Sequence, residues 1–484
     1  MDTYKTPAFI HAEAHAGLLF DNGEWRKARG GTRPVLEPAT GAVLGHAGIA
    51  NAEDMREAIG HAQAAQPAWA ALAPRERSVV LLRAAQWIEQ HFDELAPAIA
   101  RETGGILPKG QVEVKEAISL CQLAAGLPMQ AQGQVLPSVP GRLSLARRIP
   151  RGVIGVISPF NVPLILGIRS VAPALALGNA VVLKPDPRTP FSGGVIIAEM
   201  FNKAGLPPGV LQMVPGDADA GEALVTDDRV PMISFTGSAA VGRRIGELAG
   251  RHLKKVSLEL GGANNLVVLD DADLDAAASA AAFGAWFHQG QICMASNRVI
   301  VHEAVAEGLQ QRLIGKAERL RTAFGPMIDK RQLDRFDAVV QDTIRAGAKL
   351  EAGGTYEGLF YRPTVLSGVK PGMRSFDEEP FGPIVNLVTF RTDDEAVALA
   401  NQSHGGLAAA VIGRDVARAM AIGDRLNAGM IHINDQTVNN DGTNPFGGPG
   451  LAGNGSAVGG PADIDQYTRW QWVTMKSAPP TFPF

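Results

Sequence analysis

Apolar residues recur at two different spacings along the chain, which predicts helices in one region and strands in another. Between residues 53 and 103, apolar side chains return every three or four positions, the repeat of a helix with one buried face. Two helices are therefore expected, the second from about Pro74 to His91. Their apolar positions are Ala58, Ile59, Ala62 and Ala65, and then Val79, Leu82, Ala85 and Ile88.

From residue 152 onward, short apolar runs alternate with helical stretches. Apolar runs without regular polar positions are typical of parallel strands buried on both faces. The pattern therefore predicts an α/β unit with a parallel sheet covered by helices. The expected strands are residues 152–158, 180–184, 210–214, 232–235 and 255–259, with helices from Pro163, from about Ser192 to Ala204 and from about Ala239 to Gly250.

A second α/β unit is expected from Leu266 to about Asn440. It combines a helix from about Leu274 to Phe287 with strands near residues 298–301, 383–390 and 430–433. Two segments lie outside both units. Residues 134–151 have the pattern of a β-hairpin, and residues 467–474 alternate like a strand. A strand outside both units suggests pairing with another subunit.

Length and composition limit the class of protein. The 484 residues are enough for two or three domains, and 46% hydrophobic with 19% charged residues is ordinary for a globular protein. A net charge of −4 gives no reason to expect a nucleic acid partner. No apolar run predicts a membrane span, and the N-terminal segment does not resemble a secretory signal. Two cysteines in a chain of this length do not form a disulfide framework. We therefore expect the protein to be located in a reducing compartment, the cytoplasm.

Two residues could carry acyl chemistry. Cys293 follows a helix and Gly290, so a loop could present its thiol, although a lone cysteine is more often a buried apolar residue. Glu259 ends an apolar strand before two glycines, where it could be a surface carboxylate or a general base. A thiol and a carboxylate together can form a covalent adduct and then hydrolyse it. Cys121, within a helical stretch, is expected to be structural.

Three further motifs follow strands, where α/β sheets bind ligands. Asn161 could be a turn residue or an amide donor to an oxyanion. Lys184 could contact an adenosine ribose or phosphate. Ser238 opens a helix, where it could be only a cap or could mark a pyrophosphate site. The glycine run at residues 448–453 follows no strand and is expected to be a loop. No residue cluster has metal-ligand spacing, so no catalytic metal is expected.

Together these motifs resemble the aldehyde dehydrogenase superfamily. They occur in that family's order, at residues 158–161, 184–185, 235–238, 259–262, 290–293, 378–383 and 444–448. The resemblance implies an aldehyde dehydrogenase-like α/β fold with three parts and a homodimer or homotetramer. The parts are a Rossmann-type cofactor domain at residues 1–133 and 152–260, an α/β catalytic domain at 261–445, and a small β oligomerisation arm at 134–151 and 463–484.

The resemblance also implies residue roles. Cys293 would be the nucleophile, Glu259 the general base and Asn161 an oxyanion donor. The expected cofactor is NAD, and NADP stays open because Pro187 stands where NAD-preferring relatives often carry glutamate. The residues implied to bind the cofactor are Ile157, Ser158, Phe160, Lys184, Gly216, Phe235, Thr236, Gly237, Ser238, Glu379 and Phe381.

Three shorter stretches are similar to the benzaldehyde dehydrogenase branch: residues 184–190, 433–437 and 470–475. They imply oxidation of an uncharged aromatic aldehyde to its carboxylic acid, although Arg169 could face the pocket and favour a charged substrate. The alternatives are aliphatic aldehydes or semialdehydes, a coenzyme A-acylating relative, a catalytically silent relative and a cofactor-free cysteine hydrolase. The candidate pocket residues are Phe160, Val162, Arg169, Phe287, Ile292, Met294 and Phe446.

Overall fold

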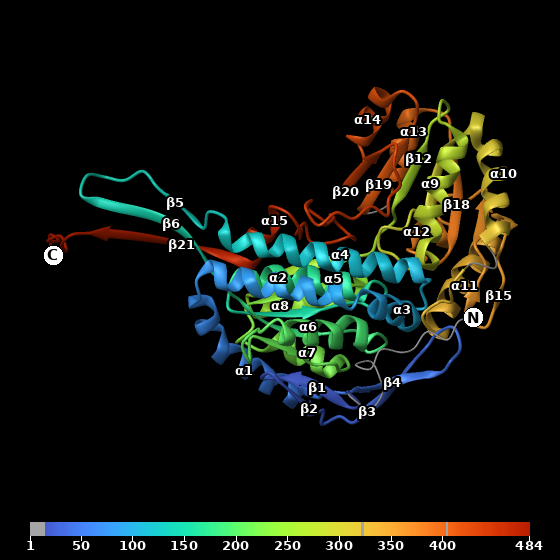
Figure 1. Ribbon diagram of the computed structural model, residues 1–484. Coiled ribbons are helices and arrows are strands. Elements are labelled where there is room, and N and C mark those ends of the chain that lie inside the picture. Colours follow the sequence, from blue (N-terminus) through green and yellow to red (C-terminus); the bar gives the residue numbers. More distant parts are fainter. Residues whose placement is uncertain (1–14, 321–323, 403–404) are drawn as a thin grey trace.

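A computed structural model describes residues 15–320, 324–402 and 405–484 (Figure 1). The described part contains two seven-stranded sheets at opposite ends of the molecule's body and a separate three-stranded sheet. Residues 1–14, which belong to the expected cofactor domain and to the segment for which no secretory signal is expected, lie outside the described residues.

The first sheet has the strand order β11-β10-β7-β8-β9-β1-β2. Its five adjacent strands from β11 to β9 run parallel, as the apolar runs predict. The expected strand boundaries hold to within two residues. These strands are β7 (Val153–Ile157), β8 (Ala180–Lys184), β9 (Leu211–Met213), β10 (Met232–Gly237) and β11 (Lys255–Leu260).

Helices cover both faces of this sheet because successive side chains of a strand point to opposite sides. In β8, Val181 and Leu183 belong to one core and Ala180 and Val182 to the other. The first core is packed by α2 (Pro74–Gln90), α3 (Phe92–Thr103), α4 (Leu107–Gly126), α5 (Pro163–Ala176) and α6 (Ile196–Lys203). The second is packed by α1 (Ala52–Ala71), α7 (Ala218–Thr226) and α8 (Ala239–Arg251).

The N-terminal strands were not expected from the sequence. The antiparallel pair β1 (Leu18–Asp21) and β2 (Glu24–Lys27) extends the first sheet beyond β9, and β3 (Thr32–Leu36) pairs with β4 (Val43–Gly48). These strands are short and lie in partly polar sequence, so their hydrophobic pattern is weak. The predicted helix from Ser192 also differs, because a π-helical turn, η2 (Phe191–Val195), precedes α6.

The second sheet has the order β14-β17-β18-β13-β12-β19-β20 and is parallel apart from its edge strand β14. All three predicted strands of this unit are present. The strands are β12 (Asn265–Val268), β13 (Arg298–His302), β14 (Lys349–Ala352), β17 (Thr364–Ser367), β18 (Ile384–Phe390), β19 (Gly406–Ile412) and β20 (Ala428–Ile433). The helices are α9 (Leu274–Trp286), α10 (Glu303–Leu320), α11 (Lys330–Arg345), α12 (Arg374–Asp377), α13 (Asp393–Asn401) and α14 (Val416–Gly423), and a small hairpin joins β15 (Tyr356–Glu357) to β16 (Phe360–Tyr361).

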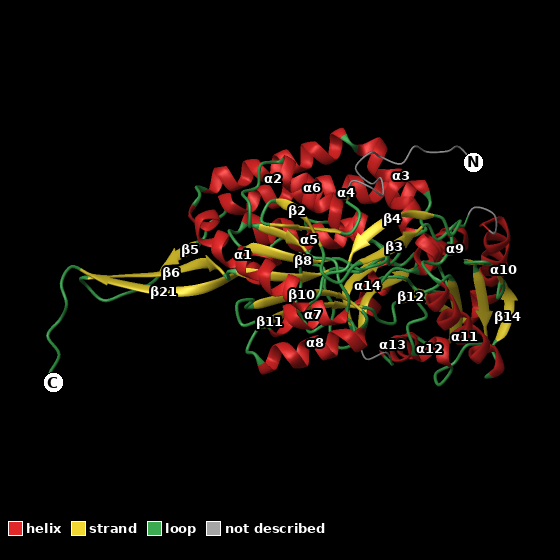
Figure 2. Ribbon diagram, turned by 90° about the horizontal axis from the view of Figure 1, so that it is seen from below, coloured by secondary structure: helices red, strands yellow, loops and turns green. Residues whose placement is uncertain are grey.

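A three-stranded sheet projects from the body as an arm (Figure 2). It consists of β5 (Gly133–Val135), β6 (Arg142–Pro150) and β21 (Thr468–Lys476), in the order β21-β6-β5. The hairpin and the C-terminal strand are therefore confirmed. The first partner of β21 is β6 of the same chain, however, so only its outer edge is open to another subunit.

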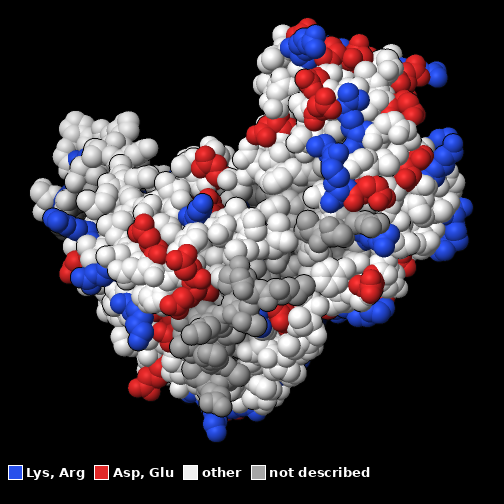
Figure 3. All heavy atoms as spheres, turned by 45° about the vertical axis from the view of Figure 1, so that its right-hand side comes forward, with Lys and Arg blue, Asp and Glu red and all other residues white. Residues whose placement is uncertain are grey.

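Two global features agree with the composition. On the face drawn in Figure 3, acidic and basic side chains of the described residues are interspersed. None of the helices in the described ranges is long and apolar enough to cross a membrane.

Candidate active site

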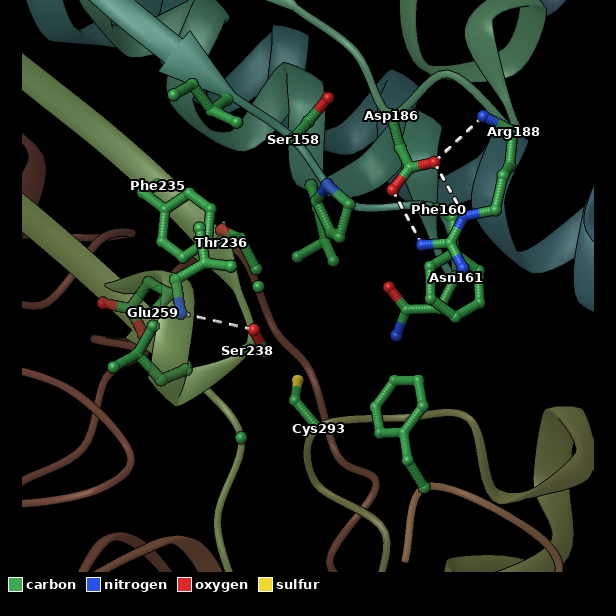
Figure 4. Close-up of a pocket in the computed structure, with 18 of the residues that line it drawn as sticks. Ser158, Phe160, Asn161, Asp186, Arg188, Phe235, Thr236, Ser238, Glu259 and Cys293 are labelled. Atoms are coloured by element: carbon green, nitrogen blue, oxygen red, sulfur yellow. Dashed lines mark hydrogen bonds and ion pairs between the residues drawn. The ribbon is translucent and has the colours of Figure 1, made fainter. Parts of the chain in front are cut away.

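A cleft of about 470 Å³ lies at the carboxyl ends of the parallel strands of the first sheet. One wall comes mainly from the ends of β7, β8, β10 and β11, and the other comes from helix α11 and loops of the second unit. The cleft brings together thirteen of the residues singled out in the sequence (Figure 4). They are Ile157, Ser158, Phe160, Asn161, Lys184, Phe235, Thr236, Gly237, Ser238, Glu259, Cys293, Glu379 and Phe381.

The loop before Cys293 has an unusual backbone. His288, Gln289 and Gly290 have consecutive φ values of 49°, 55° and 65°. The left-handed conformation is strained for the first two residues, and such strain is typical of functional loops. A Cβ on Gly290 would lie 2.2 Å from the Gly382 carbonyl oxygen, so only glycine fits there. The loop thus turns sharply and exposes the Cys293 thiol to the cleft.

Asn161 is held beside this loop. Its side-chain Nδ2 donates a hydrogen bond to the Gln291 carbonyl at 2.8 Å, and the residue is 3% exposed. The start of α5 behind it is fixed by Glu113, whose carboxylate accepts from the Leu164 N–H at 3.0 Å and pairs with the buried Lys109. The amide of Asn161 therefore has a defined orientation next to the nucleophile loop.

Glu259 lies near the end of β11, where its neighbour on β10 is Thr236. It is 5% exposed, and neither carboxylate oxygen has a hydrogen-bond partner among the described residues. Burial raises the pKa of this carboxyl well above its ordinary value, and the nearby Arg169 opposes the rise. A carboxyl group in such surroundings holds its proton to a higher pH than an ordinary glutamate, so its ionised form is a stronger proton acceptor, as a general base requires.

The Cys293 thiol is also perturbed. Its pKa is raised to about 12, chiefly by burial; the charges of Glu379 and Glu259 also raise the pKa, and Arg169 lowers it. The Cys293 carbonyl accepts a hydrogen bond from Asn264 Nδ2 at 2.7 Å, which holds the backbone on the side away from the thiol. In these surroundings the thiol is predominantly protonated, so it needs a proton acceptor before it can attack. Cys121 is fully buried in α4 and borders no described cavity.

The cleft also has groups suited to a nucleotide. Ser238 caps α8, whose first N–H groups and dipole favour an anion. Lys184 ends β8 and is largely buried. Glu379 has its pKa raised to about 7 by burial, and its Oε1 has no hydrogen-bond partner among the described residues. Ser158 Oγ is likewise buried without a partner in the described part of the chain.

Several residues of the cleft were not singled out in the sequence. Arg188 donates to the Asp186 carboxylate through Nε and Nη2, both at 2.9 Å, and its guanidinium lies 3.9 Å from the centre of the Phe160 ring. The spacing of an acid and an arginine two positions apart in the run at 184–190 was the available signal. On α11, Gln332 Nε2 donates to the Phe381 carbonyl at 3.1 Å, which holds Phe381 at a φ of 51°.

The candidate substrate residues lie elsewhere, except for Phe160. Ile292, Met294 and Phe446 form a buried cluster on the other side of Cys293, with Phe287 packed against it. Phe446 also borders a separate hollow of about 380 Å³ with residues of β20 and the 439–445 segment. Val162 packs on the core of the first unit.

Gly216 is also outside the cleft. It borders a small neighbouring hollow with Arg33 and Asp217. The glycine run at residues 448–453 contains no helix or regular strand and forms a loop, as expected. No group of three metal-ligating side chains is present within the described ranges.

The chain belongs to the aldehyde dehydrogenase family, whose family model matches residues 25–473. It is therefore an oxidoreductase acting on aldehydes, and the resemblance of its motifs is confirmed. It is 50% identical to a vanillin dehydrogenase from Amycolatopsis sp. over 99% of this chain and 100% of that one. It is 47% identical to benzaldehyde dehydrogenase [NAD(+)] from Pseudomonas putida over 97% of this chain and 98% of that one.

A solved structure has the same fold. The salicylaldehyde dehydrogenase from Pseudomonas putida G7, crystallised in complex with salicylaldehyde, has a TM-score of 0.92 and 34% identity to this chain. The match covers 96% of this chain and 99% of that one. The aldehyde dehydrogenase-like α/β fold expected from the sequence is thus confirmed.

Proposed function

We propose that this protein oxidises aromatic aldehydes to carboxylic acids with NAD. The observation that carries the proposal is that one cleft is lined by Cys293, Glu259 and Asn161 and also by Lys184 and Ser238. Relatives named for vanillin, benzaldehyde and salicylaldehyde support an aromatic substrate. The buried cluster behind Cys293 supplies aromatic and aliphatic surface suited to such a ring.

The cleft fits a dinucleotide. The buried, unpartnered oxygens of Glu379 and Ser158 call for hydroxyl or N–H partners, which a ribose and an amide provide. A Cβ on Gly261 would meet the Glu379 carboxylate at 2.0 Å, so this glycine leaves room for it. We assign Lys184 to the adenosine ribose, Ser238 to the pyrophosphate region, and Glu379 with Phe381 to the nicotinamide ribose. When bound, NAD supplies the hydride acceptor.

Cys293 and the residues around it then have separate roles in the reaction. The Cys293 thiol loses its proton to water in the cleft, the resulting thiolate adds to the carbonyl carbon, and the electron pair of the C=O bond moves to oxygen. Asn161 Nδ2 and the Cys293 N–H donate hydrogen bonds to that oxygen. Oxidation of this adduct leaves a thioester on the sulfur. Glu259 takes a proton from water, the hydroxide displaces the thiolate, and the carboxylic acid is released.

Glu259 favours hydrolysis over transfer to coenzyme A. A carboxyl group with both oxygens unpartnered at the cleft is available to a water molecule. Transfer to coenzyme A would need no such base. Pro187, which lines the cleft beside Asp186, leaves the use of NADP open.

The remaining assignments follow the family resemblance. We assign residues 1–133 and 152–260 to the cofactor domain, 261–445 to the catalytic domain, and 134–151 with 463–484 to the oligomerisation arm. The arm carries exposed apolar residues, among them Val135, Trp470 and Trp472, which favour a homodimer or homotetramer. We expect the protein in the cytoplasm.

The test is a substrate panel followed by the absorbance of the reduced nicotinamide. Benzaldehyde, hexanal and succinic semialdehyde are each offered with NAD and with NADP, in the presence and absence of coenzyme A. We expect the highest kcat/KM with benzaldehyde and NAD, free benzoate as the product, and no acceleration by coenzyme A. A higher kcat/KM with succinic semialdehyde, or a benzoyl thioester of coenzyme A as the product, contradicts the proposal.

A further inference from the structure

Arg33 and Asp217 form an ion pair beside the cleft. Arg33 Nη1 donates to Asp217 Oδ1 at 2.9 Å, and Nη2 donates to Oδ2 at 2.7 Å, so both carboxylate oxygens are engaged. Arg33 lies on β3, and Asp217 directly precedes α7. The two residues border a small hollow together with Pro187, which also lines the cleft. The pair is therefore next to the part of the cleft where Pro187 takes the place of a glutamate.

The backbone fixes the position of this pair. Ala50, which follows β4, forms a parallel bridge with Gly216. A Cβ on Gly216 would lie 2.7 Å from the Ala50 carbonyl oxygen, so glycine permits this close approach. β4 pairs in turn with β3. The hairpin is thus held against the turn before α7, which brings Arg33 to Asp217.

The Asp217 carboxylate serves this pair rather than its own helix. Asp217 is at the N-cap position of α7, where an aspartate usually accepts hydrogen bonds from the first N–H groups, yet its side chain makes no such bond. The charge of Lys184, which we assign to the adenosine ribose, interacts with those of Asp217 and Arg33. Asp186 also interacts with Lys184, but it is bonded to Arg188 (Figure 4). Two ion pairs therefore adjoin Lys184, and the Arg33–Asp217 pair is the one that faces the hollow.

We propose that Arg33 and Asp217 are specificity-determining residues that make the cleft select NAD over NADP. The inference rests on the proposed NAD-dependent oxidation and assigns its cofactor selectivity to a pair outside the position where a glutamate is expected. NADP differs from NAD only by a phosphate on the 2′ oxygen of the adenosine ribose. A ribose held by Lys184 brings that phosphate close to the Asp217 carboxylate, which repels it and keeps the Arg33 donors engaged. The uncharged 2′-hydroxyl of NAD is not repelled.

The test is isothermal titration calorimetry of the whole protein with NAD and with NADP, which measures binding without turnover. The wild type should bind NAD more tightly. Asp217→Asn keeps the shape of the side chain but removes its charge and weakens its hold on Arg33, whose fork can then bind a phosphate. The Kd for NADP should fall by about five- to tenfold, and the Kd for NAD should change by less than about twofold. The gain should shrink in about 0.5 M NaCl, because exposed charges are screened.

A double-mutant cycle separates the contributions of the two residues. Arg33→Gln removes the cation that neutralises the Asp217 carboxylate, so NADP should bind more weakly than it binds to the wild type. In Arg33→Gln/Asp217→Asn the phosphate meets neither the repelling charge nor the arginine. This double variant should therefore lose most of the gain and bind NADP at least about threefold more weakly than Asp217→Asn does.

Glu222→Gln is the matched control. Glu222 lies on α7 and accepts a hydrogen bond from Arg244 Nη2 at 2.8 Å, so its replacement removes the same charge and releases an arginine. Neither of these described residues lines the cleft or the hollow. The ratio of the two Kd values should stay at the wild-type value. A second measurement needs no variant: the wild type should bind 5′-AMP more tightly than adenosine 2′,5′-bisphosphate.

Five results overturn the inference. They are equal binding of NAD and NADP by the wild type, equal binding of 5′-AMP and the bisphosphate, an unchanged Kd ratio in Asp217→Asn, a gain that persists in the double variant, and an equal gain in Glu222→Gln. Each of them can occur while the protein binds NAD and oxidises benzaldehyde, so the proposed function survives. A wild type that binds neither dinucleotide contradicts the proposed function itself.

Discussion

The two sides of Cys293 are built in different ways. On one side the ends of four neighbouring parallel strands and a helix N-terminus form a cleft with unpartnered polar atoms. On the other side, residues from the segments around 292 and 446 pack into a closed apolar cluster. The first side depends on backbone geometry that short motifs encode, whereas the second depends on side chains from distant segments. The type of reaction is therefore easier to infer from the sequence than the identity of the substrate is.

Removal of the Cys293 sulfur should have the largest effect, because it should abolish catalysis but not the binding of NAD. Cys293→Ala should lower kcat by at least about 10⁴-fold, because no other thiol lines the cleft among the described residues. Binding of NAD should persist, since the strand ends that hold it are unchanged. Steady-state assays and a fluorescence titration with NAD measure the two effects. Residual turnover near the wild-type level would show that the chemistry does not pass through this thiol.

Glu259→Gln should separate the formation of the thioester from its hydrolysis. The variant should release about one equivalent of reduced nicotinamide per site in a rapid-mixing experiment, and its steady-state rate should then fall by about 10²–10⁴-fold. Glu247→Gln, an exposed glutamate on α8, is the control and should behave as the wild type. Sustained turnover in Glu259→Gln would remove Glu259 from the hydrolytic step.

The same residue predicts a pH dependence. Burial raises the pKa of Glu259, so the carboxylate that accepts a proton forms only as the pH rises above the ordinary range of a glutamate. The steady-state kcat of the wild type should therefore increase as the pH rises above the ordinary titration range of a glutamate, and the increase should be absent in Glu259→Gln. Steady-state rates of the wild type and of Glu259→Gln at several pH values check this expectation. A kcat that falls with rising pH would contradict the role of the Glu259 carboxylate as a proton acceptor.

Asn161→Ala should lower kcat by about 10²–10³-fold, the usual effect of losing one oxyanion donor. The KM for NAD should stay close to the wild-type value, because the amide points to the nucleophile loop rather than to the strand ends. Asn161→Asp keeps the shape but removes the donor, and it should be equally impaired. If Asn161→Asp recovers activity, the residue has only a packing role.

Two phenylalanines give the smallest and most selective effect. Phe235 borders the cleft at the end of β10, and Phe446 belongs to the cluster on the other side of Cys293. Phe235→Leu should raise the KM for NAD, and Phe446→Leu should raise the KM for the aldehyde, each by about tenfold. Initial-rate kinetics with both substrates varied measure the two constants. If each variant changes both constants equally, the two sides do not act separately.

Much of the fold was predictable because apolar strands and amphipathic helices have clear periodicities. The order of the motifs along the chain, which resembles that of a known family, also predicted that Cys293, Glu259 and Asn161 would lie together. The strand pair β1–β2 was not found, since four-residue strands with polar positions give no reliable pattern. The left-handed backbone of His288 and Gln289 was equally hidden, because neither residue type is specific for that conformation. The position of Arg169 against Phe446 depends on tertiary packing alone.

The register of the arm has a consequence for how the chain matures on the ribosome. Arg148 and Thr468 are 320 residues apart in the chain yet bond to each other, and nine consecutive residue pairs join β21 to β6. During synthesis β6 is made early, and the edge that later pairs with β21 stays without a partner strand until β21 has been synthesised. Closing so long a loop is slow, and an unpaired edge attracts other strands. Conditions that slow translation between these strands should therefore increase aggregation of the nascent protein.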